Sequence, residues 1–472
     1  MIFRRFYDET LAQASYLVGC AGSGEAVVVD PNRLVDQYVA AAESEGVRIV
    51  GVTETHIHAD YLSGTRELAA RTDARMYLSA CGTPDWQYAF ASDPMVTLLR
   101  HGDHIRVGNV ALRAVHTPGH TPEHLTFLIT DGAVATEPMG ACTGDFVFVG
   151  DVGRPDLLEK AAKVAGASDS AARDLWQSLE AFKAHPDHVQ IWPGHGAGSA
   201  CGKGLSAVPQ STLGYERRYN WAFGAANEAE FVAMVLAGQP EPPRYFGLMK
   251  RLNREGPALL GSLPSPERVG ESRLRALLDA GAVVVDTRPA SAFAAEHVPG
   301  TLNIPLNKSF TTWAGSLLPY DRDLYLIMPD ASSASVEAAV RNLVLIGLDR
   351  VAGYLGAEAV TLWAAEGEPT GTIPHLSPRE VVASGREPFI VDVRAESEWD
   401  AGHLPGAVHI PLPELEERLG EIPADREVVL QCQGGGRSAI AASLLKARGR
   451  DRVANLAGGY AAWVTAGLPV EK

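Results

Sequence analysis

The sequence lacks the features that would place the protein in a membrane or on nucleic acid. No apolar run reaches the roughly 18 residues that a membrane-spanning helix requires. Residues 1–9 include a basic pair but have no apolar segment behind them, so we expect no signal peptide. With 41 basic against 57 acidic residues, the net charge of −16 argues against nucleic acid or an anionic membrane surface as the main partner.

Cysteine is also scarce. The five cysteines are odd in number and widely spaced, so they do not form a disulfide framework, and we expect a cytoplasmic enzyme. Apolar residues, in contrast, are plentiful: they make up 46% of the chain, enough for several buried cores. A chain of 472 residues is too long for one ordinary domain, and its length suggests about three.

One short stretch, residues 53–61, concentrates side chains that can bind a metal. His56, His58 and Asp60 alternate just beyond the apolar run 47–52, which reads as a buried strand. This alternation sends two imidazoles and a carboxylate to one side of a tight loop, where a cation can hold them together. The alternative is a polar loop with two hydrogen-bonded histidines, but ligand-type residues at this spacing are costly to group without a metal.

Three further clusters each stand beside an apolar run. They are 116–122 with His120, 141–145 with Asp145, and 191–196 with His195, and all could converge on one edge of a sandwich. The order H-x-H-x-D, T-P-G-H-T, T-G-D, P-G-H-G resembles the metallo-β-lactamase superfamily over residues 1 to about 250. The resemblance implies an αββα sandwich with the metal at one edge.

Tyr61 distinguishes this sequence from the two-zinc hydrolases of that superfamily, which have histidine at this position. A second metal site would lose a nitrogen ligand, so a single metal is favoured. The subgroup that the chain most resembles is the persulfide dioxygenases, which implies His56, His120 and Asp145 as the ligands of one Fe(II) per chain. Such a facial triad leaves positions open for a sulfur substrate and dioxygen. Zinc is the alternative metal.

The resemblance leaves supporting roles to several neighbours. His58, Asp60, Tyr61 and His195 are expected to orient the ligands and hold the loop. Arg154, in the stretch 150–156 that also resembles the subgroup, either buttresses the site, faces an anionic substrate or forms a surface ion pair. Cys201 is either a small core residue or a thiol near the iron, with Lys203 lowering its pKa.

The second half contains an internal repeat. Asp286 and Asp392, like His297 and His403, lie 106 residues apart within matching stretches. Each copy alternates strand and helix, which predicts a parallel α/β sheet with helices on both faces. A shift to Pro and Gly around 255–270 marks a linker, so the expected domains are 1–260, 265–370 and 372–472.

The second copy carries a reactive cysteine. Cys432 follows the predicted strand 427–431, and the predicted helix 439–448 comes after a glycine-rich loop. Backbone N–H groups and a helix N-terminus around a thiol stabilise negative sulfur. The stretch resembles a single-domain rhodanese, in which Cys432 would form the persulfide and Arg437 would assist, and the six residues 432–437 match sulfurtransferases rather than the longer loop of related phosphatases. The sulfur-cradling residues would be Gln433, Gly434, Gly435, Gly436 and Ser438. The alternative is a buried, inert cysteine.

The first copy has no cysteine in the corresponding stretch 324–333, so it reads as an inactive rhodanese-like domain with a spacer or docking role. The whole chain resembles the CstB-type fusions of a persulfide dioxygenase with two rhodanese domains. This implies that a low-molecular-weight thiol persulfide is oxidised by dioxygen to sulfite and thiol. Cys432 would pass sulfur to sulfite to give thiosulfate, or work in reverse, and both directions stay open.

The same resemblance leads us to expect a homo-oligomer, and the net charge leads us to expect that it binds neither nucleic acid nor membrane. Two other functions compete with this one. The first is a glyoxalase II-like thioester hydrolase that uses a metal hydroxide. The second is a sulfur carrier or sensor whose reactive element is Cys432.

Overall fold

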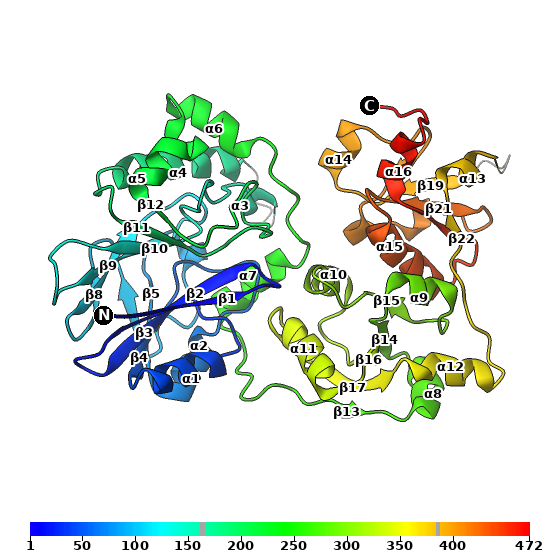
Figure 1. Ribbon diagram of the computed structural model, residues 1–472, viewed down its shortest axis with the longest axis horizontal. Helices are drawn as coiled ribbons and strands as arrows, with labels where there is room; N and C mark the ends of the chain where they lie inside the picture. The colour runs from blue at the N-terminus through cyan, green and yellow to red at the C-terminus, as the bar shows by residue number, and fades with distance from the viewer. Residues whose placement is uncertain (161–165, 384–387) are drawn as a thin grey trace. The chain divides into compact units, whose positions relative to one another are not determined.

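The computed structural model describes residues 1–160, 166–383 and 388–472, and the chain divides into two units. The first comprises Met1–Leu263 with Val344–Gly347, and the second comprises Pro264–Leu343 and Leu348–Lys472. Each unit encloses its own hydrophobic cores around its own sheets (Figure 1).

Two six-stranded sheets form the centre of the first unit. In one sheet, an antiparallel meander of β1 to β3 continues as parallel strands to β6. Its strands are β1 (Ile2–Asp8), β2 (Gln13–Cys20), β3 (Glu25–Val29), β4 (Arg48–Thr53), β5 (Arg75–Ser79) and β6 (Val96–Leu99). β2 is buried over its whole length, as expected of a strand that is covered on both faces.

The other sheet runs in the order β12-β11-β10-β9-β8-β7. Its strands are β7 (His104–Val107), β8 (Val110–His116), β9 (Leu125–Asp131), β10 (Gly140–Gly144), β11 (Gln190–Pro193) and β12 (Ser211–Thr212). β7 to β10 are antiparallel neighbours, and β11 is parallel to β10. β8, β10 and β11 therefore point the same way, and their carboxyl ends share one edge of the sheet.

Helices cover the outer faces of the paired sheets, as Figure 1 shows. On the first sheet, Tyr38 of α1 (Asp36–Ser44) and Leu68 of α2 (Thr65–Thr72) pack among strand residues. On the second sheet, Leu175 and Phe231 do the same from the other side. A further core fills the space between the sheets. The order helix, sheet, sheet, helix confirms the expected αββα sandwich. The remaining helices of this unit are α3 (Leu157–Lys160), α4 (Ala167–Phe182), α5 (Leu213–Tyr219), α6 (Glu228–Leu236), α7 (Phe246–Glu255) and the 3-10 turns Pro84–Trp86 and Trp221–Gly224.

The second unit contains two five-stranded sheets with the same strand order and parallel pairing throughout. The strands of the first are β13 (Glu267–Arg268), β14 (Val283–Asp286), β15 (Leu302–Asn303), β16 (Leu324–Met328) and β17 (Val351–Gly356). Those of the second are β18 (His375–Leu376), β19 (Phe389–Asp392), β20 (Val408–His409), β21 (Val428–Gln431) and β22 (Val453–Leu456). This confirms the two parallel α/β domains predicted from the repeat.

Helices connect these strands. In the first copy they are α8 (Leu274–Asp279), α9 (Ala290–Ala295), α10 (Phe310–Leu317), α11 (Ser333–Val344) and α12 (Glu358–Ala365), with the 3-10 turn Glu271–Arg273. In the second they are α13 (Pro378–Ala383), α14 (Glu396–Ala401), α15 (Gly436–Ala447) and α16 (Gly459–Thr465), with 3-10 turns at Leu412–Glu414 and Leu419–Glu421.

The strand and helix predictions agree with the structure except at one boundary that matters. The helix after Cys432 was predicted over 439–448, but α15 begins at Gly436. Its first turn therefore contains Arg437 and Ser438, and the N–H groups of that turn have no partner inside the helix. The loop is three residues shorter than predicted, which brings the helix N-terminus closer to the cysteine.

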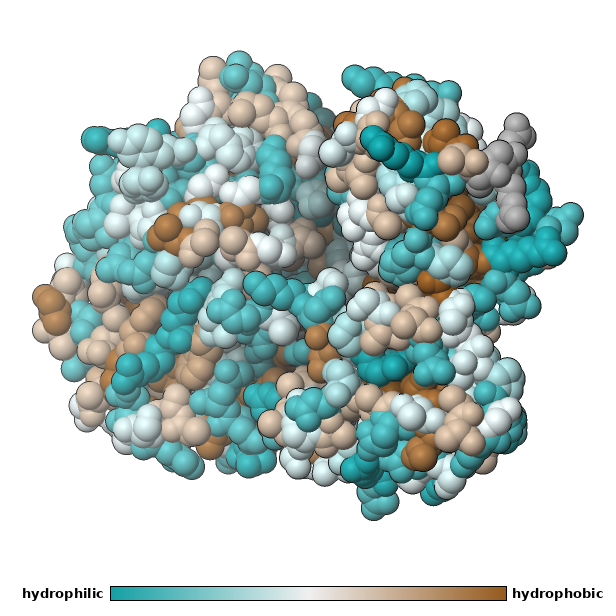
Figure 2. Space-filling view, turned by 45° about the vertical axis from the view of Figure 1, so that its right-hand side comes forward, coloured by the Kyte–Doolittle hydropathy of each residue, from teal (hydrophilic) through white to brown (hydrophobic). Residues whose placement is uncertain are grey.

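Among the described residues, no helix combines the length and apolar character needed to cross a membrane. In the space-filling view of Figure 2, hydrophilic residues cover most of the visible surface, and hydrophobic residues appear in small separate groups.

Candidate metal and sulfur-transfer sites

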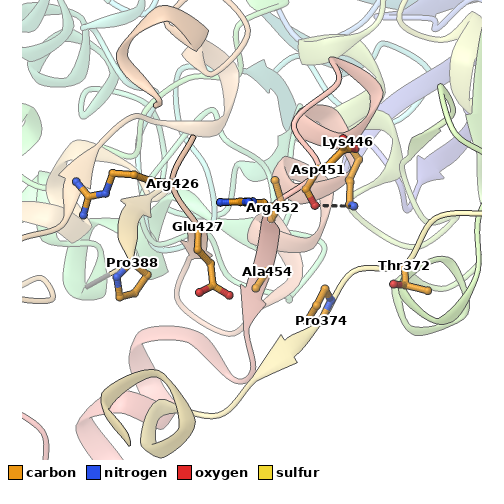
Figure 3. Close-up of a pocket in the computed structure, with 10 residues that line it drawn as sticks. Thr372, Pro374, Pro388, Arg426, Glu427, Lys446, Asp451, Arg452 and Ala454 are labelled. Atoms are coloured by element: carbon orange, nitrogen blue, oxygen red, sulfur yellow. Dashed lines mark hydrogen bonds between the residues drawn. The ribbon is translucent and has the colours of Figure 1, made fainter. Parts of the chain in front are cut away.

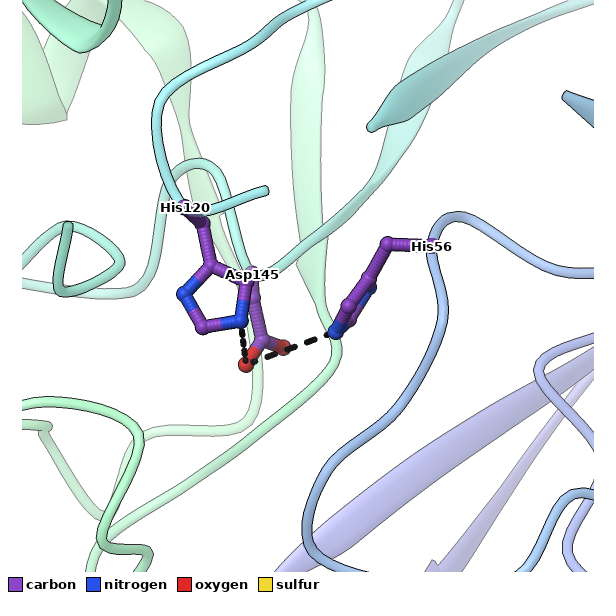
Figure 4. Close-up of side chains that lie close together, drawn as sticks. All are labelled: His56, His120 and Asp145. Carbon is purple, nitrogen blue, oxygen red and sulfur yellow. Dashed lines mark ion pairs between the residues drawn. The ribbon is translucent and has the colours of Figure 1, made fainter. Parts of the chain in front are cut away.

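Three buried side chains of ligand type meet at the edge where the strands of the first unit end (Figure 4). His120 Nε2 lies 3.4 Å from Asp145 Oδ2, and His56 Nε2 lies 4.0 Å from the same oxygen. Each of the three residues is at most 2% exposed. The structure therefore brings together the three residues that the family resemblance implied as metal ligands, with their donor atoms facing one another.

A chain of hydrogen bonds orients His56. Thr55 Oγ1 donates to Asp30 Oδ2 over 2.9 Å, so it accepts the Nδ1–H of His56, also over 2.9 Å. With its proton on Nδ1, the ring presents the Nε2 lone pair to a metal. Asp30, at the end of β3, also accepts the Thr55 N–H over 2.6 Å. Sequence reasoning missed Asp30, although an acidic residue directly after a buried strand was a visible signal.

His120 and Asp145 are oriented in the same way. His120 Nδ1 donates to the carbonyl oxygen of Arg154 over 3.0 Å, and the Asp145 N–H donates to His124 Nε2 over 3.2 Å. A Cβ on Gly153 would lie 1.7 Å from the carbonyl oxygen of Asp145, so only glycine fits there. His124 is a second residue that sequence reasoning missed, four positions after a predicted ligand.

Burial determines which protonation states these groups adopt. It lowers the pKa of His56 well below its ordinary value and also lowers the pKa of His120, so both rings are neutral at neutral pH. Burial raises the pKa of Asp145, but His195 and His120 outweigh it and bring that pKa below its usual value. Two neutral imidazoles and one ionised carboxylate are the form in which these side chains bind a divalent metal.

The carboxylate of Asp145 also fits a bound cation. Both of its oxygens are buried, and no N–H or O–H group of the described residues donates to them; the Cys201 thiol lies against the carboxylate. A buried carboxylate with so few hydrogen-bond donors is unfavourable, and a metal ion removes that cost. Two nitrogens and one oxygen suit iron or zinc.

His58 and Tyr61 lie apart from this set. His58 Nε2 is 3.1 Å from Asp30 Oδ1; burial lowers the pKa of His58, but the Asp30 carboxylate outweighs it and raises the pKa to about 9. The ring centroid of Tyr61 lies 4.6 Å from that of His58, and the phenol donates to the Asp30 carbonyl oxygen over 3.4 Å. Both side chains therefore hold the loop through Asp30.

A second group of ligand type adjoins the first. His195 Nε2 lies 3.4 Å from Asp60 Oδ2 and 3.5 Å from Asp145 Oδ1, and Cys201 completes a buried cluster with Asp60 and His195. His195 Nδ1 donates to the carbonyl oxygen of Ala12 over 3.0 Å, so its Nε2 faces inward. Asp145 thus lies between two groups of side chains that can bind a metal.

Arg154 buttresses the site from behind. Its fully buried guanidinium donates to both oxygens of Asp156, at 2.8 and 2.7 Å, and to the carbonyl oxygen of Ala200 at 3.0 Å. Its own N–H donates to the carbonyl oxygen of Cys201 over 3.3 Å. Of the roles considered from the sequence, the contacts match the buttress, because the guanidinium ties the Cys201 segment to the loop that orients His120.

Cys201 is buried, as the core-residue alternative expects, and the other alternative, in which Lys203 lowers its pKa, is wrong. The Lys203 ammonium lies 4.4 Å from the ring centroid of Trp221 and donates to the carbonyl oxygens of Met234 and Ala237. Burial and the charges of Asp145 and Asp60 raise the pKa of the Cys201 thiol well above its ordinary value. Proximity in sequence was misleading, because the lysine side chain packs onto the helical layer instead.

In the second unit, Cys432 follows the carboxyl end of β21, where it is 2% exposed. The Gly435 N–H lies 3.1 Å from Cys432 Sγ, and Ser438 Oγ donates to the same sulfur over 3.3 Å. Gly435 has φ +95°, a conformation that favours glycine. Of the predicted cradle, Gly435 and Ser438 contact the sulfur, whereas Gln433, Gly434 and Gly436 are exposed.

The first copy has methionine where the second has this cysteine. Asp286 pairs with Ile327 across the sheet just as Asp392 pairs with Gln431, so the residues that follow, Met328 and Cys432, occupy equivalent positions. A thioether cannot form a persulfide.

A pocket of about 650 Å³ opens in the second copy (Figure 3). It is lined by residues at the amino ends of β21 and β22, including Glu427 and Arg452, whereas the cysteine follows the carboxyl end of β21. Lys446 Nζ donates to the carbonyl oxygen of Asp451 across its rim, over 2.9 Å. Ligands of parallel sheets bind at the carboxyl ends, so this pocket is not part of the site around Cys432.

Comparison with known proteins agrees with this division of the chain. The family model described as the metallo-beta-lactamase superfamily matches residues 9–195, and the model of the rhodanese-like domain matches 271–360 and 378–466. The crystal structure of a metallo-beta-lactamase from Staphylococcus aureus is 44% identical, covering 75% of this chain and 99% of that one with a TM-score of 0.69. The chain belongs to the metallo-β-lactamase superfamily.

Curated relatives include two hydrolases that each match 59% of the chain. A probable metallo-hydrolase of Burkholderia pseudomallei is 28% identical over 59% of this chain and 100% of its own length. A hydroxyacylglutathione hydrolase of Cereibacter sphaeroides is also 28% identical, over 59% of this chain and 91% of its own. In this member of the superfamily, two rhodanese-like domains follow the metallo-β-lactamase fold, which indicates an enzyme with a metal-binding site.

Proposed function

We propose that the protein is a persulfide dioxygenase joined to a sulfurtransferase, similar to the CstB-type fusions. One observation carries the first half: His56, His120 and Asp145 form a compact buried set, while His58 and Tyr61 are held by Asp30. A set of two imidazoles and one carboxylate supports a single Fe(II), which would supply neighbouring positions for a sulfur anion and dioxygen.

The residues around this set prepare it for that chemistry. Thr55 and the carbonyl oxygen of Arg154 hold the Nδ1 protons of the two histidines, so both Nε2 atoms stay available. Asp145 supplies one negative charge, which leaves a divalent site net positive and attractive to a persulfide anion. The burial of all three side chains keeps bulk water from the reactive sulfur.

In the second half of the proposal, Cys432 takes up sulfane sulfur. The Gly435 N–H and the Ser438 hydroxyl lie against its sulfur and stabilise negative charge on it. Sulfite formed from a persulfide is an acceptor for sulfur on Cys432, and thiosulfate is then the product. The substrates proposed are a low-molecular-weight thiol persulfide, dioxygen and sulfite.

The test is metal analysis and oxygen uptake on full-length protein prepared without oxygen. We expect about one iron per chain and oxygen consumption that depends on added thiol persulfide, with sulfite appearing. Asp145→Asn should lose the iron and the oxygen uptake while sulfur transfer by Cys432 persists. Zinc at full occupancy without oxygen consumption would refute the dioxygenase assignment.

A second candidate is a thioester hydrolase, and two findings favour it. Hydroxyacylglutathione hydrolases are among the relatives, and Asp60, His195 and Cys201 form a second buried group of donors beside Asp145. Two metals bridged by a carboxylate can activate water for hydrolysis. Two bound metals per chain and release of thiol from an acyl-glutathione would support this candidate over the first.

A further inference from the structure

The carbonyl side of the loop that follows Cys432 lies against the start of α16. The Tyr460 N–H donates to the carbonyl oxygen of Cys432 over 2.8 Å, and the Ala461 N–H donates to that of Gln433 over 3.1 Å. A Cβ on Gly459 would lie 2.0 Å from the Cys432 carbonyl oxygen, so only glycine fits at this contact. Because the carbonyl and the N–H of a trans peptide point in opposite directions, these contacts turn the N–H groups of the same peptides away from α16.

Gly435 ends this loop, and hydrogen bonds hold both its N–H and its carbonyl group. The N–H lies 3.1 Å from Cys432 Sγ. The carbonyl oxygen accepts the Ala439 N–H, which is the first hydrogen bond of α15, and the Nδ2–H of Asn455, each over 3.2 Å. Asn455 lies in β22, the strand beside β21. Its side chain therefore ties to the sheet the residue whose N–H faces the sulfur.

Asn455 is an unfavourable residue for the fold alone. It is 2% exposed, and its Oδ1 is buried with no hydrogen-bond partner among the described residues. A buried amide with one donated bond and an unpaired acceptor costs free energy that an apolar side chain of similar shape would avoid. The benefit of the asparagine is therefore to be sought in the group that its Nδ2 holds, which is the Gly435 carbonyl.

The first rhodanese-like copy has no amide at the corresponding position. Two residues before the cysteine, Leu430 pairs with Asn455 of β22; two residues before the corresponding methionine, Leu326 pairs with Tyr354 of β17. The two sheets nevertheless have the same strand order. The asparagine thus accompanies the cysteine, and the sheet itself does not require it.

We propose that Asn455 is a positioning residue for Cys432, and that it holds the Gly435 carbonyl so that the Gly435 N–H stays directed at the sulfur. The inference rests on the proposed sulfurtransferase function of Cys432. Gly435 has φ +95° and no side chain that packing could fix, so its peptide groups rotate easily unless hydrogen bonds restrain them. An N–H that donates to the sulfur favours the thiolate, which is the form that attacks a sulfur donor.

The rate at which iodoacetamide alkylates Cys432 in the full-length chain tests the inference. Labelling is followed by mass spectrometry of the peptide that contains this cysteine, which separates it from the other four. Asn455→Ala removes the amide and cannot overpack the site. We expect its alkylation rate near pH 7 to fall about five-fold, as for the loss of one hydrogen bond, and to approach the wild-type rate at high pH, where the thiol ionises in both chains.

A second variant and a matched control separate positioning from damage to the domain. Asn455→Leu should show the same fall in alkylation, while its thermal unfolding midpoint stays unchanged or rises because the unpaired amide oxygen is gone. Tyr354→Leu changes the corresponding sheet position in the first copy and should leave the alkylation of Cys432 unchanged. An unchanged rate in Asn455→Ala, or a fall in that variant that persists at high pH, would overturn the inference.

Alkylation does not depend on sulfur transfer, so failure of this inference is distinct from failure of the proposed function. Transfer from a thiol persulfide to cyanide should fall in Asn455→Ala by the same factor of about five near pH 7. A chain that transfers sulfur and alkylates at a rate independent of Asn455 would refute the positioning role alone. A wild-type chain in which alkylation depends on Asn455 but no sulfur is transferred would instead refute the sulfurtransferase function.

Discussion

In both rhodanese-like domains, the second strand of the domain ends in a buried aspartate. This aspartate forms an ion pair with an arginine two residues later. Arg288 Nη2 lies 2.7 Å from Asp286 Oδ2, and Arg394 Nη2 lies 2.7 Å from Asp392 Oδ2. Each arginine also donates to a carbonyl oxygen at the far end of the next helix, that of Glu296 or Gly402. This part of the scaffold is the same in the two copies.

The copies diverge at the carboxyl ends of β16 and β21. The second has Cys432, with the Gly435 N–H and Ser438 hydroxyl against the sulfur. The first has Met328, and the loop after it is organised by Asp330, which accepts hydrogen bonds from Ser332 and Ser335. A fold of this kind is kept by its buried pairs and its core, whereas its chemistry depends on a few loop residues that can be lost without unfolding it.

We expect the largest loss of activity when the cysteine that is present only in the second copy is replaced. Cys432→Ser should reduce sulfur transfer by about 10³-fold or more, because the serine hydroxyl does not carry the negative sulfur that accepts the donor. Oxygen uptake with a thiol persulfide should be unchanged, since the histidine and aspartate set belongs to the other unit. Loss of both activities in this variant would show that the two sites do not work as separate modules.

The shared aspartates should matter for stability in both copies. Asp392→Asn leaves Arg394, which is 1% exposed, without its partner, and removing one member of a buried pair costs about 3–5 kcal/mol. Asp286→Asn should cost somewhat less, because the Arg288 side chain is 12% exposed. Hydrogen exchange at β19 and β14 in the full-length chain measures each loss locally. Equal hydrogen-exchange protection in the wild-type chain and in both variants would show that these ion pairs do not stabilise the fold.

Whether the sequence predicts a contact depends on how many residues separate the two groups along the chain. The convergence of the metal-ligand motifs was predictable because each stands near a strand end and the strand directions bring those ends to one edge. The choice of His56, His120 and Asp145 as the ligands came from the family resemblance. Asp30 could be noticed as an acidic residue after a buried strand, but its contact with Thr55 was not predictable, because that contact depends on β3 lying beside β4. The ion pair of Arg437 with Glu398 was not predictable either, since 39 residues separate the two.

The same reasoning explains why the alternative that placed Lys203 beside the Cys201 thiol is wrong. Lys203 is two residues away, but a two-residue separation does not fix where a long side chain points. The structure places its ammonium over Trp221 and leaves the thiol among Asp145 and Asp60. Local spacing predicts which residues share a loop, and packing decides which of them share an environment.

A smaller effect is expected from the hydroxyl that lies against the reactive sulfur. Ser438→Ala removes the donor 3.3 Å from Cys432 Sγ, and one such hydrogen bond contributes about 1 kcal/mol, so the rate of sulfur transfer should fall about five-fold. Ser335 in the first copy donates to Asp330 instead, and Ser335→Ala is the matched control. An equal fall in both variants would mean that the loss is not local to the cysteine.

The smallest effect is expected when the cysteine is placed in the first copy. Met328→Cys in a Cys432→Ser chain should restore no measurable sulfur transfer, because the position alone does not supply the surroundings. The first copy places the carboxylate of Asp330 two residues after the graft, and negative charge there opposes a thiolate and an anionic donor. Thiocyanate formation from thiosulfate and cyanide measures the outcome. Recovery of about 1% of wild-type activity would correspond to a loss of only about 2.7 kcal/mol in transition-state stabilisation. That result would show that a cysteine at this strand end is sufficient for sulfur transfer and that the loop only increases its rate.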